Sequence, residues 1–175
     1  MKKVSVVIPM YYEQEVAEVC YKRVKKVLDE LKEKYEHEII FINDGSKDKT
    51  LDILQDIAKV DKNVKIISFS RNFGHQAAVT AGLKYVTGDA IIIIDADLQD
   101  PPELIPDMIE KWEQGYEVIY GKRKKRNGES AFKLLTAKAF YTALNKLSDV
   151  DIPGDTGDFR LVDKKVVDVI NSLPE

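Results

Sequence analysis

The sequence is poor in the residues that build disulfides and zinc sites. It contains one cysteine, Cys20, and two histidines among 175 residues. A single cysteine forms no internal disulfide, so a reducing, cytosolic setting is expected. Zinc sites draw on cysteine and histidine, so a zinc centre is disfavoured. Cys20 lies among the apolar positions of a predicted helix and is interpreted as a small core residue, not as a reactive thiol.

Long apolar runs and an excess of basic residues are also missing. The longest apolar run, Ala90 to Ile94, falls far short of the roughly 20 residues that a membrane span requires. The run that ends at Pro9 is too short for a signal peptide. Lys and Arg number 27 against 30 Asp and Glu, which argues against nucleic acid as a partner. We therefore expect a soluble chain that folds as one domain over residues 1–175.

Two glycine-rich nucleotide-binding motifs are absent. The chain has no Gly-x-x-x-x-Gly-Lys-Ser/Thr segment, which disfavours a P-loop NTPase. The first predicted strand leads into Pro9-Met10-Tyr11-Tyr12, where an NAD-binding domain would have a Gly-x-Gly-x-x-Gly turn. Any nucleotide site in this chain must therefore be built from other residues.

What the sequence does contain is a regular alternation of strand and helix patterns. β-branched runs alternate with apolar residues at helical spacing. Such units predict an α/β fold with a mostly parallel sheet, helices on both faces, and a ligand site at the carboxyl ends of the strands. Strands are expected at 4–8, 38–42, 64–69, 90–94, 118–120 and 159–162, helices within 16–31, 51–58, 74–86, 102–112, 132–147 and 166–173, and loops at 122–130 and 151–157.

Acidic and amide side chains follow the expected strands. Glu13 comes after the first strand, Asp44 after the second, Ser70-Arg71-Asn72 after the third and Asp95-Ala96-Asp97-Leu98-Gln99 after the fourth. Carboxylates that converge on one crevice repel one another, and a hard divalent cation relieves that repulsion. The pattern predicts an Mg²⁺ or Mn²⁺ site in which Asp97 and Gln99, alternating along an extended segment, face the ion together. Taken alone, Asp95 and Asp97 also fit ordinary turn residues or helix caps ahead of Pro101.

Five motifs occur in a recognisable order. They are VVIPMYYEQE, NDGSKDKT, SRNFGHQAAVTAGL, DADLQDPPE and GDFRL. Over essentially its whole length the sequence resembles the inverting glycosyltransferases with the GT-A fold, and within them the polyprenyl-phosphate branch, the relatives of dolichyl-phosphate mannose synthase and bactoprenol glucosyltransferase. The resemblance implies a GT-A fold and the metal-dependent transfer of a hexose from a nucleotide sugar to a polyprenyl phosphate.

The resemblance also implies roles for individual residues. Asp158 matches a carboxylate proposed as the base in related enzymes. A lipid phosphate acceptor is already largely ionised near neutral pH, so orientation alone is an equal alternative for this residue. Two positions depart from the family, with Tyr12 where Asn is common and Asn43 where a second Asp is common. The implied nucleotide-sugar ligands are Pro9, Tyr11, Glu13, Asp44 at the base, Asp95, Ala96 and Arg123, the implied metal ligands are Asp97 and Gln99, and the implied catalytic residues are Asp158 and Arg123.

The densest basic run covers residues 122–126. Arg126, like Arg123, is a predicted phosphate ligand of the nucleotide sugar because a guanidinium group binds phosphate in bidentate geometry. The two lysines between them fit a solvated loop, and the run is also suited to anionic lipid headgroups. His75, at a predicted helix start, is interpreted as polar packing or capping, and Trp112, at helical spacing, as core.

Three functions are weighed for the chain. The leading one is hexose transfer to a polyprenyl phosphate, with UDP-glucose favoured over GDP-mannose and UDP-N-acetylhexosamine as donor. The alternatives are transfer to a glycan hydroxyl and a nucleotide-sugar-binding domain without turnover. The resemblance also places the activity at the cytoplasmic face of the cell membrane. We expect this chain to be a soluble catalytic fragment, truncated at its C-terminal end, of an enzyme that meets the membrane through a later region, and a homo-oligomer is left open.

Overall fold

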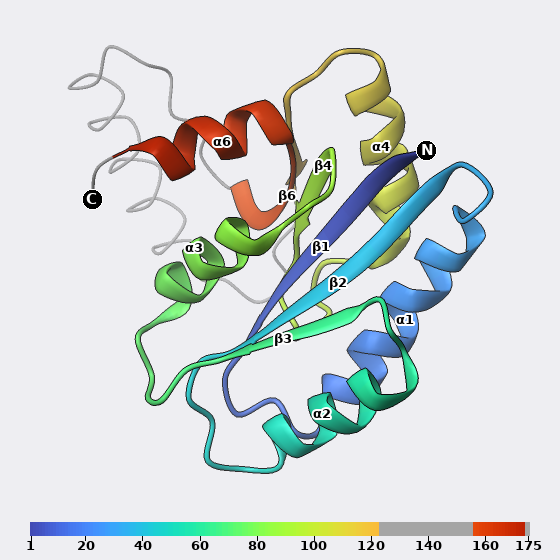
Figure 1. Ribbon diagram of the computed structural model, residues 1–175. Coiled ribbons are helices and arrows are strands. Elements are labelled where there is room, and N and C mark those ends of the chain that lie inside the picture. The colour runs from blue at the N-terminus through green and yellow to red at the C-terminus, as the bar shows by residue number, and fades with distance from the viewer. Residues whose placement is uncertain (123–155, 174–175) are drawn as a thin grey trace, which may run out of the picture.

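A six-stranded sheet forms the centre of the fold, with the strand order β3-β2-β1-β4-β6-β5. The computed structural model describes residues 1–122 and 156–173 (Figure 1). The predicted helix at 132–147 and most of the two predicted loops lie outside these residues. The strands are β1 (Lys2–Met10), β2 (Tyr35–Asn43), β3 (Val64–Ser68), β4 (Ala90–Ile93), β5 (Val118–Lys122) and β6 (Thr156–Asp163).

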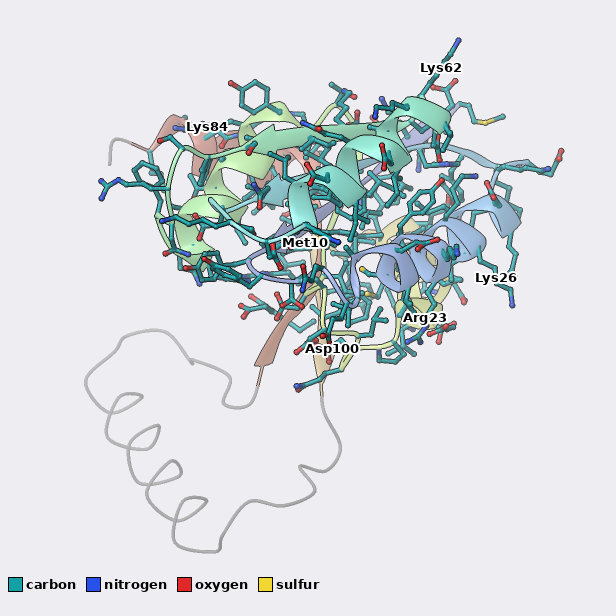
Figure 2. All side chains as sticks on the ribbon, turned by 90° about the horizontal axis from the view of Figure 1, so that it is seen from below. Met10, Arg23, Lys26, Lys62, Lys84 and Asp100 are labelled. Atoms are coloured by element: carbon teal, nitrogen blue, oxygen red, sulfur yellow. The ribbon has the colours of Figure 1, made fainter. Side chains whose placement is uncertain are left out.

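Helices cover both faces of the sheet (Figure 1). They are α1 (Ala17–Glu30), α2 (Thr50–Val60), α3 (His75–Tyr85), a short 3₁₀ turn (Pro102–Leu104) that leads into α4 (Ile105–Glu113), and α6 (Lys164–Ser172). Successive residues of a strand point to opposite faces. Val6 and Ile8 of β1 accordingly pack in a cluster with α1, α2 and α4, whereas Val7 packs with α3 and α6. In Figure 2 Met10 lies inside the fold, while Lys26, Lys62 and Lys84 point outward.

The predicted α/β fold class is confirmed, with one difference in strand direction. Strands β1 to β4 pair in parallel, as the repeated βα units predict. Strand β6 lies between β4 and β5 and runs antiparallel to both, so the sheet is mixed. Strand β6 also begins at Thr156, earlier than the predicted residue 159, and therefore includes Asp158. This longer strand brings Asp158 toward the carboxyl end of β4.

Most predicted core positions are buried, and a few details differ. Cys20 is fully buried and Trp112 is 8% exposed. Val19 of α1 is 49% exposed, because the buried stripe of that helix follows Cys20, Val24 and Val27. None of the helices in the described part of the chain is both long and apolar enough to cross a membrane.

A buried carboxylate ties together the strands at the amino-terminal edge of the sheet. Glu38 is 2% exposed, and its carboxylate accepts hydrogen bonds from the Ser5 hydroxyl (2.6 Å) and the Thr87 amide (2.7 Å). The ammonium groups of Lys65 and Lys3 lie 2.6 and 3.2 Å from it. Burial raises the pKa of Glu38, but the hydrogen bonds lower it further, to about 2. The chain therefore holds this group ionised inside the fold.

Candidate functional site

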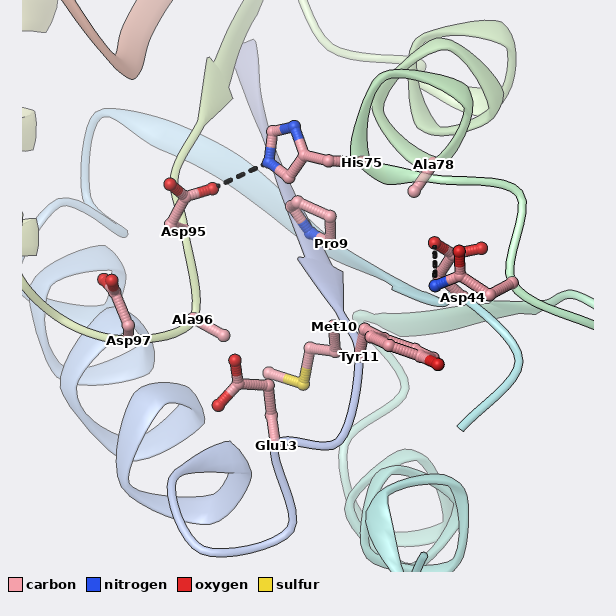
Figure 3. A pocket seen from close by; sticks show the side chains of 11 residues that line it. Pro9, Met10, Tyr11, Glu13, Asp44, His75, Ala78, Asp95, Ala96 and Asp97 are labelled. Carbon is pink, nitrogen blue, oxygen red and sulfur yellow. Dashed lines mark hydrogen bonds and ion pairs between the residues drawn. The ribbon is translucent and has the colours of Figure 1, made fainter. Parts of the chain in front are cut away.

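A cavity of about 280 Å³ opens at the carboxyl ends of β1, β2 and β4 (Figure 3). The strand-end rule predicts a ligand site at this edge of the sheet. Seven of the predicted ligands line the cavity, and their roles as ligands stay predictions. The lining residues are Pro9, Met10, Tyr11, Glu13, Asp44, Asn72, His75, Ala78, Asp95, Ala96 and Asp97.

The end of β1 turns sharply to place Glu13 at the start of α1. Tyr12 has a φ of 57°, in the left-handed region, and its amide donates to the Ser46 hydroxyl at 3.0 Å. The amide of Glu13 donates to the hydroxyl of Thr50 at 3.0 Å, and its carbonyl accepts hydrogen bonds from the first residues of the helix. The Ser46 hydroxyl thus holds this turn. Asp48 accepts a hydrogen bond from the Thr50 amide at 3.1 Å just ahead of α2, whose N-cap residue, Lys49, makes no side-chain cap hydrogen bond.

Three carboxylates gather at one end of the cavity. Glu13, Asp95 and Asp97 come from two different strand ends and face the same space (Figure 3). The pKa of Glu13 is raised by burial and then by the negative charges of Asp97, Asp48 and Asp95. The neighbouring carboxylates repel one another, and a bound cation would relieve that repulsion. Oxygen ligands of this kind suit Mg²⁺ or Mn²⁺.

The segment after β4 is a turn, not the extended segment that was predicted. Leu98 has a φ of 58°, and the Asp97 carboxylate accepts a hydrogen bond from the Gln99 amide at 3.0 Å. The interpretation of Asp97 as a turn residue is therefore correct. It does not oppose the metal interpretation, because a carboxylate keeps further lone pairs for a second partner. Asp97 lines the cavity, and Gln99 is not among the described lining residues. Gln99 as a metal ligand stays a prediction.

Strand β6 brings a further acidic residue, Asp158, close to Asp95 and His75. It pairs with β4 so that Arg160 lies opposite Ile93, and continuing that register by two residues sets Asp158 opposite Asp95. Ligand atoms of His75, Asp95 and Asp158 all lie within 4.8 Å of one another. The Arg160 guanidinium lies 3.5 Å from the Asp158 carboxylate. Asp158 as a base or as an orienting group stays a prediction.

His75 contributes more to this site than the sequence suggested. Its Nε2 lies 2.9 Å from an Asp95 carboxylate oxygen, and its ring lines the cavity (Figure 3). No side chain caps α3, whose N-cap residue is Gly74. The capping interpretation of His75 is therefore wrong, whereas its contact with Asp95 is the polar packing that was the other expectation. Its place at a strand-to-helix connection on the carboxyl edge was the available signal.

The end of β2 organises the loop that follows β3. The Asn43 side chain donates to Ser68 at 3.0 Å and accepts from the Ser46 amide at 3.2 Å. Asn43, which stands where the family commonly has Asp, therefore links the end of β2 to the end of β3. Asp44 is 3% exposed, and its carboxylate accepts from the amide of Phe73 at 2.7 Å. Asn72 belongs to the third strand-end segment named by the sequence pattern but had been given no role.

The predicted phosphate ligands Arg123 and Arg126 lie outside the described residues.

Comparison with known proteins agrees with this architecture. The profile of glycosyl transferase family 2 matches residues 5–170. An uncharacterized glycosyltransferase of Bacillus subtilis, YkcC, is 56% identical over 98% of this chain and 52% of its own length. The bactoprenol glucosyl transferase of Shigella phage SfX is 47% identical over 99% of this chain and 56% of its own length. The chain thus spans about half the length of these curated relatives.

Solved structures show the same fold. Glucosyl-3-phosphoglycerate synthase from Mycobacterium tuberculosis, in complex with Mn²⁺, UDP-glucose and phosphoglyceric acid, superposes with a TM-score of 0.67 at 20% identity. The match covers 94% of this chain and 58% of that one. At this identity the likeness shows the fold alone. Together with the family profile and the close relatives, it leads to one conclusion: the chain belongs to glycosyl transferase family 2 and has the GT-A fold.

Proposed function

We propose that this chain transfers a hexose, most simply glucose from UDP-glucose, to a polyprenyl phosphate, with Mg²⁺ or Mn²⁺ bound at the acidic end of the cavity. The relative from Shigella phage SfX, 47% identical over 99% of this chain, is named a bactoprenol glucosyl transferase. The structural neighbour at a TM-score of 0.67 holds UDP-glucose and Mn²⁺. Because the acceptor is a membrane lipid, the reaction would take place at the cytoplasmic face of the cell membrane.

The observation that carries this proposal is the division of the cavity into two chemically different ends. Glu13, Asp95 and Asp97 occupy one end, and Ala78 and Asp44 the other, as Figure 3 shows. The Asp44 carboxylate differs from the other three because it is 3% exposed and already hydrogen-bonded to the Phe73 amide. A nucleotide sugar has the same division, with a diphosphate that binds a divalent cation and a nucleoside that carries no charge. The acidic end therefore suits the cation and diphosphate, and the opposite end suits the base.

The residues of the chain then have distinct tasks. Asp97, with Asp95 beside it, would hold the cation, which when bound neutralises the charge of the departing diphosphate. Asp158 lies close to Asp95, where it can orient the acceptor. A phosphate acceptor has a second pKa near 6 and is largely ionised at neutral pH, so it needs little help from a base. Arg123 and Arg126 are proposed to pair with phosphate oxygens.

A panel of donors and acceptors tests this proposal. Thermal unfolding of the chain would be followed with UDP-glucose, GDP-mannose and UDP-N-acetylglucosamine, each with Mn²⁺ or Mg²⁺. A ligand at 100 times its Kd stabilises a fold by about 2.7 kcal/mol, which at this size raises Tm by roughly 5–10 °C. We expect that rise with UDP-glucose.

The acceptor is tested by transfer of labelled glucose to a polyprenyl phosphate and, in parallel, to oligosaccharides. Glucose on the lipid phosphate supports the proposal. A strict requirement for a glycan would replace the proposed acceptor. Metal-dependent binding without any transfer by the full-length protein would identify a binding domain and refute the proposed activity.

A further inference from the structure

The loop from Arg71 to Gly74 is held by close contacts at the end of the cavity that lies away from Asp95 and Asp97. Gly45 has a φ of 71°, and a Cβ built on it would lie 2.3 Å from the Arg71 carbonyl carbon and 2.6 Å from the Asn72 nitrogen. The two backbones therefore touch, and only glycine fits between them. The Arg71 guanidinium lies 4.5 Å from the centre of the Phe73 ring, which stiffens the loop further.

The Asp44 carboxylate is used by this loop. It accepts hydrogen bonds from the Phe73 amide at 2.7 Å, the Gly74 amide at 3.0 Å and the Asn72 side-chain nitrogen at 3.0 Å. An ionised carboxylate offers about four lone-pair positions, so three of them are taken. Asp44 is also only 3% exposed. In this structure the carboxylate positions the loop, and the direct contact with the base that the family resemblance implies stays a prediction.

The same hydrogen bonds fix the orientation of the Asn72 side chain. Its amide nitrogen must face Asp44, because the flipped amide would set a carbonyl oxygen against a carboxylate oxygen, and both are acceptors. The amide oxygen Oδ1 then faces away from Asp44. Asn72 is exposed and lines the cavity. Asp44 thus takes one N–H of the Asn72 amide and turns the acceptor Oδ1 away from itself at this end of the cavity.

We propose that Asn72 is the residue that selects the nucleobase, with its Oδ1 accepting a hydrogen bond from an N–H in the base ring. Uracil carries such a group at N3 and guanine at N1. Cytosine and adenine have an acceptor at the corresponding nitrogen, which would repel Oδ1. Tyr11, which is 47% exposed in the cavity lining, offers a flat surface on which the base can stack. This inference rests on the proposed function, because it requires a nucleotide in this cavity.

The test is the preference for UDP over CDP, two nucleotides that share the ribose and diphosphate and differ in the base, at ring nitrogen N3 and at the neighbouring position 4. Their Kd values with Mn²⁺ would be measured by titration calorimetry for the unchanged chain and for Asn72→Ala. We expect the unchanged chain to prefer UDP by roughly tenfold or more, since a site built around one hydrogen bond rejects a base that leaves it unpaired. In Asn72→Ala the affinity for UDP should fall and that for CDP should not, so the preference shrinks to about threefold or less.

Two further variants make the outcome unambiguous. Asn72→Ser keeps a donor for Asp44 but is too short to present an acceptor to the base, so it should lose the preference while the loop stays intact. Asn63→Ala removes an exposed asparagine at the opposite edge of the sheet and should leave both Kd values unchanged.

An unchanged UDP preference in both Asn72 variants would overturn the inference while leaving the proposed function standing. Equal weakening of UDP and CDP would also overturn it, because Asn72 would then support the loop without selecting the base. Absence of UDP binding to the unchanged chain would overturn the proposed function itself, and the inference with it.

Discussion

Replacing Glu38 by glutamine removes a buried negative charge from the edge of the sheet opposite the cavity. The glutamine keeps the size of the side chain but no longer attracts the ammonium groups of Lys3 and Lys65. Burial raises the pKa of Glu38, and its hydrogen bonds outweigh that effect and lower it from 4.5 to about 2. One pKa unit corresponds to 1.36 kcal/mol, so the ionised group contributes about 3 kcal/mol to the free energy of unfolding.

The sign of the pH dependence follows from the direction of the shift. A carboxylate whose pKa is lowered by folding contributes its full stability above the unfolded value, near pH 4.5, and loses it as the pH falls toward 2. Urea unfolding of both proteins at several pH values between 7 and 2 measures this directly. The unchanged chain should exceed Glu38→Gln by about 3 kcal/mol at pH 7, and the difference should shrink steadily below pH 4.5.

The exposed neighbour Glu36, two residues earlier on β2, supplies the matched control. Glu36→Gln should change the free energy of unfolding by less than about 0.5 kcal/mol, as is usual for surface positions. A Glu38→Gln effect below about 1 kcal/mol at pH 7, or one that does not vary with pH, would refute the reasoning.

Three further changes test other parts of the structure. Gly45→Ala should lower the free energy of unfolding in urea by at least about 2 kcal/mol, because the new Cβ would lie 2.3 Å from the Arg71 carbonyl carbon at a positive φ; a neutral effect would contradict this contact. Cys20, whose pKa burial raises to about 12, should resist a thiol reagent in the native chain and react in urea, and rapid native labelling would contradict its burial. Trp112→Phe removes a hydrogen bond of 2.6 Å to Asp163 and should cost about 1–2 kcal/mol by the same urea assay; a cost below about 0.3 kcal/mol would contradict its importance.

Much of the site could be predicted because local sequence patterns locate the strands. In such sheets the ligand site lies at the carboxyl ends of the strands, so the residues that follow each strand could be assigned to it. A β-branched run followed by Glu13, Asp44 or Asp95 needs no knowledge of the tertiary structure to be assigned to the carboxyl edge of the sheet. All three line the cavity. The direction of β6 was not predictable in this way. It depends on the path of the chain between β5 and β6, which hydrophobic periodicity does not encode.

The remaining differences come from contacts between distant residues. The turn at Leu98 has a positive φ although no glycine or asparagine marks it, so propensity gave no warning. His75 and Asp95 are 20 residues apart, and Asp44 and Asn72 are 28 apart. The packing of α3 against the sheet brings His75 to Asp95, and the pairing of β2 with β3 brings Asn72 to Asp44. A sequence pattern names residues at strand ends, but it does not say which of them pair with each other.

The central claim is that Asp97 holds a divalent cation through which this chain binds a nucleotide sugar. Titration calorimetry of UDP-glucose, with Mn²⁺ and then with excess EDTA, would be carried out on the unchanged chain, on Asp97→Asn and on Asp107→Asn, an exposed aspartate of α4 that serves as control. We predict at least tenfold weaker binding after EDTA, the same loss in Asp97→Asn with Mn²⁺ present, and no change in Asp107→Asn. Equal affinity for UDP-glucose with and without metal, or in Asp97→Asn and the unchanged chain, would contradict the claim.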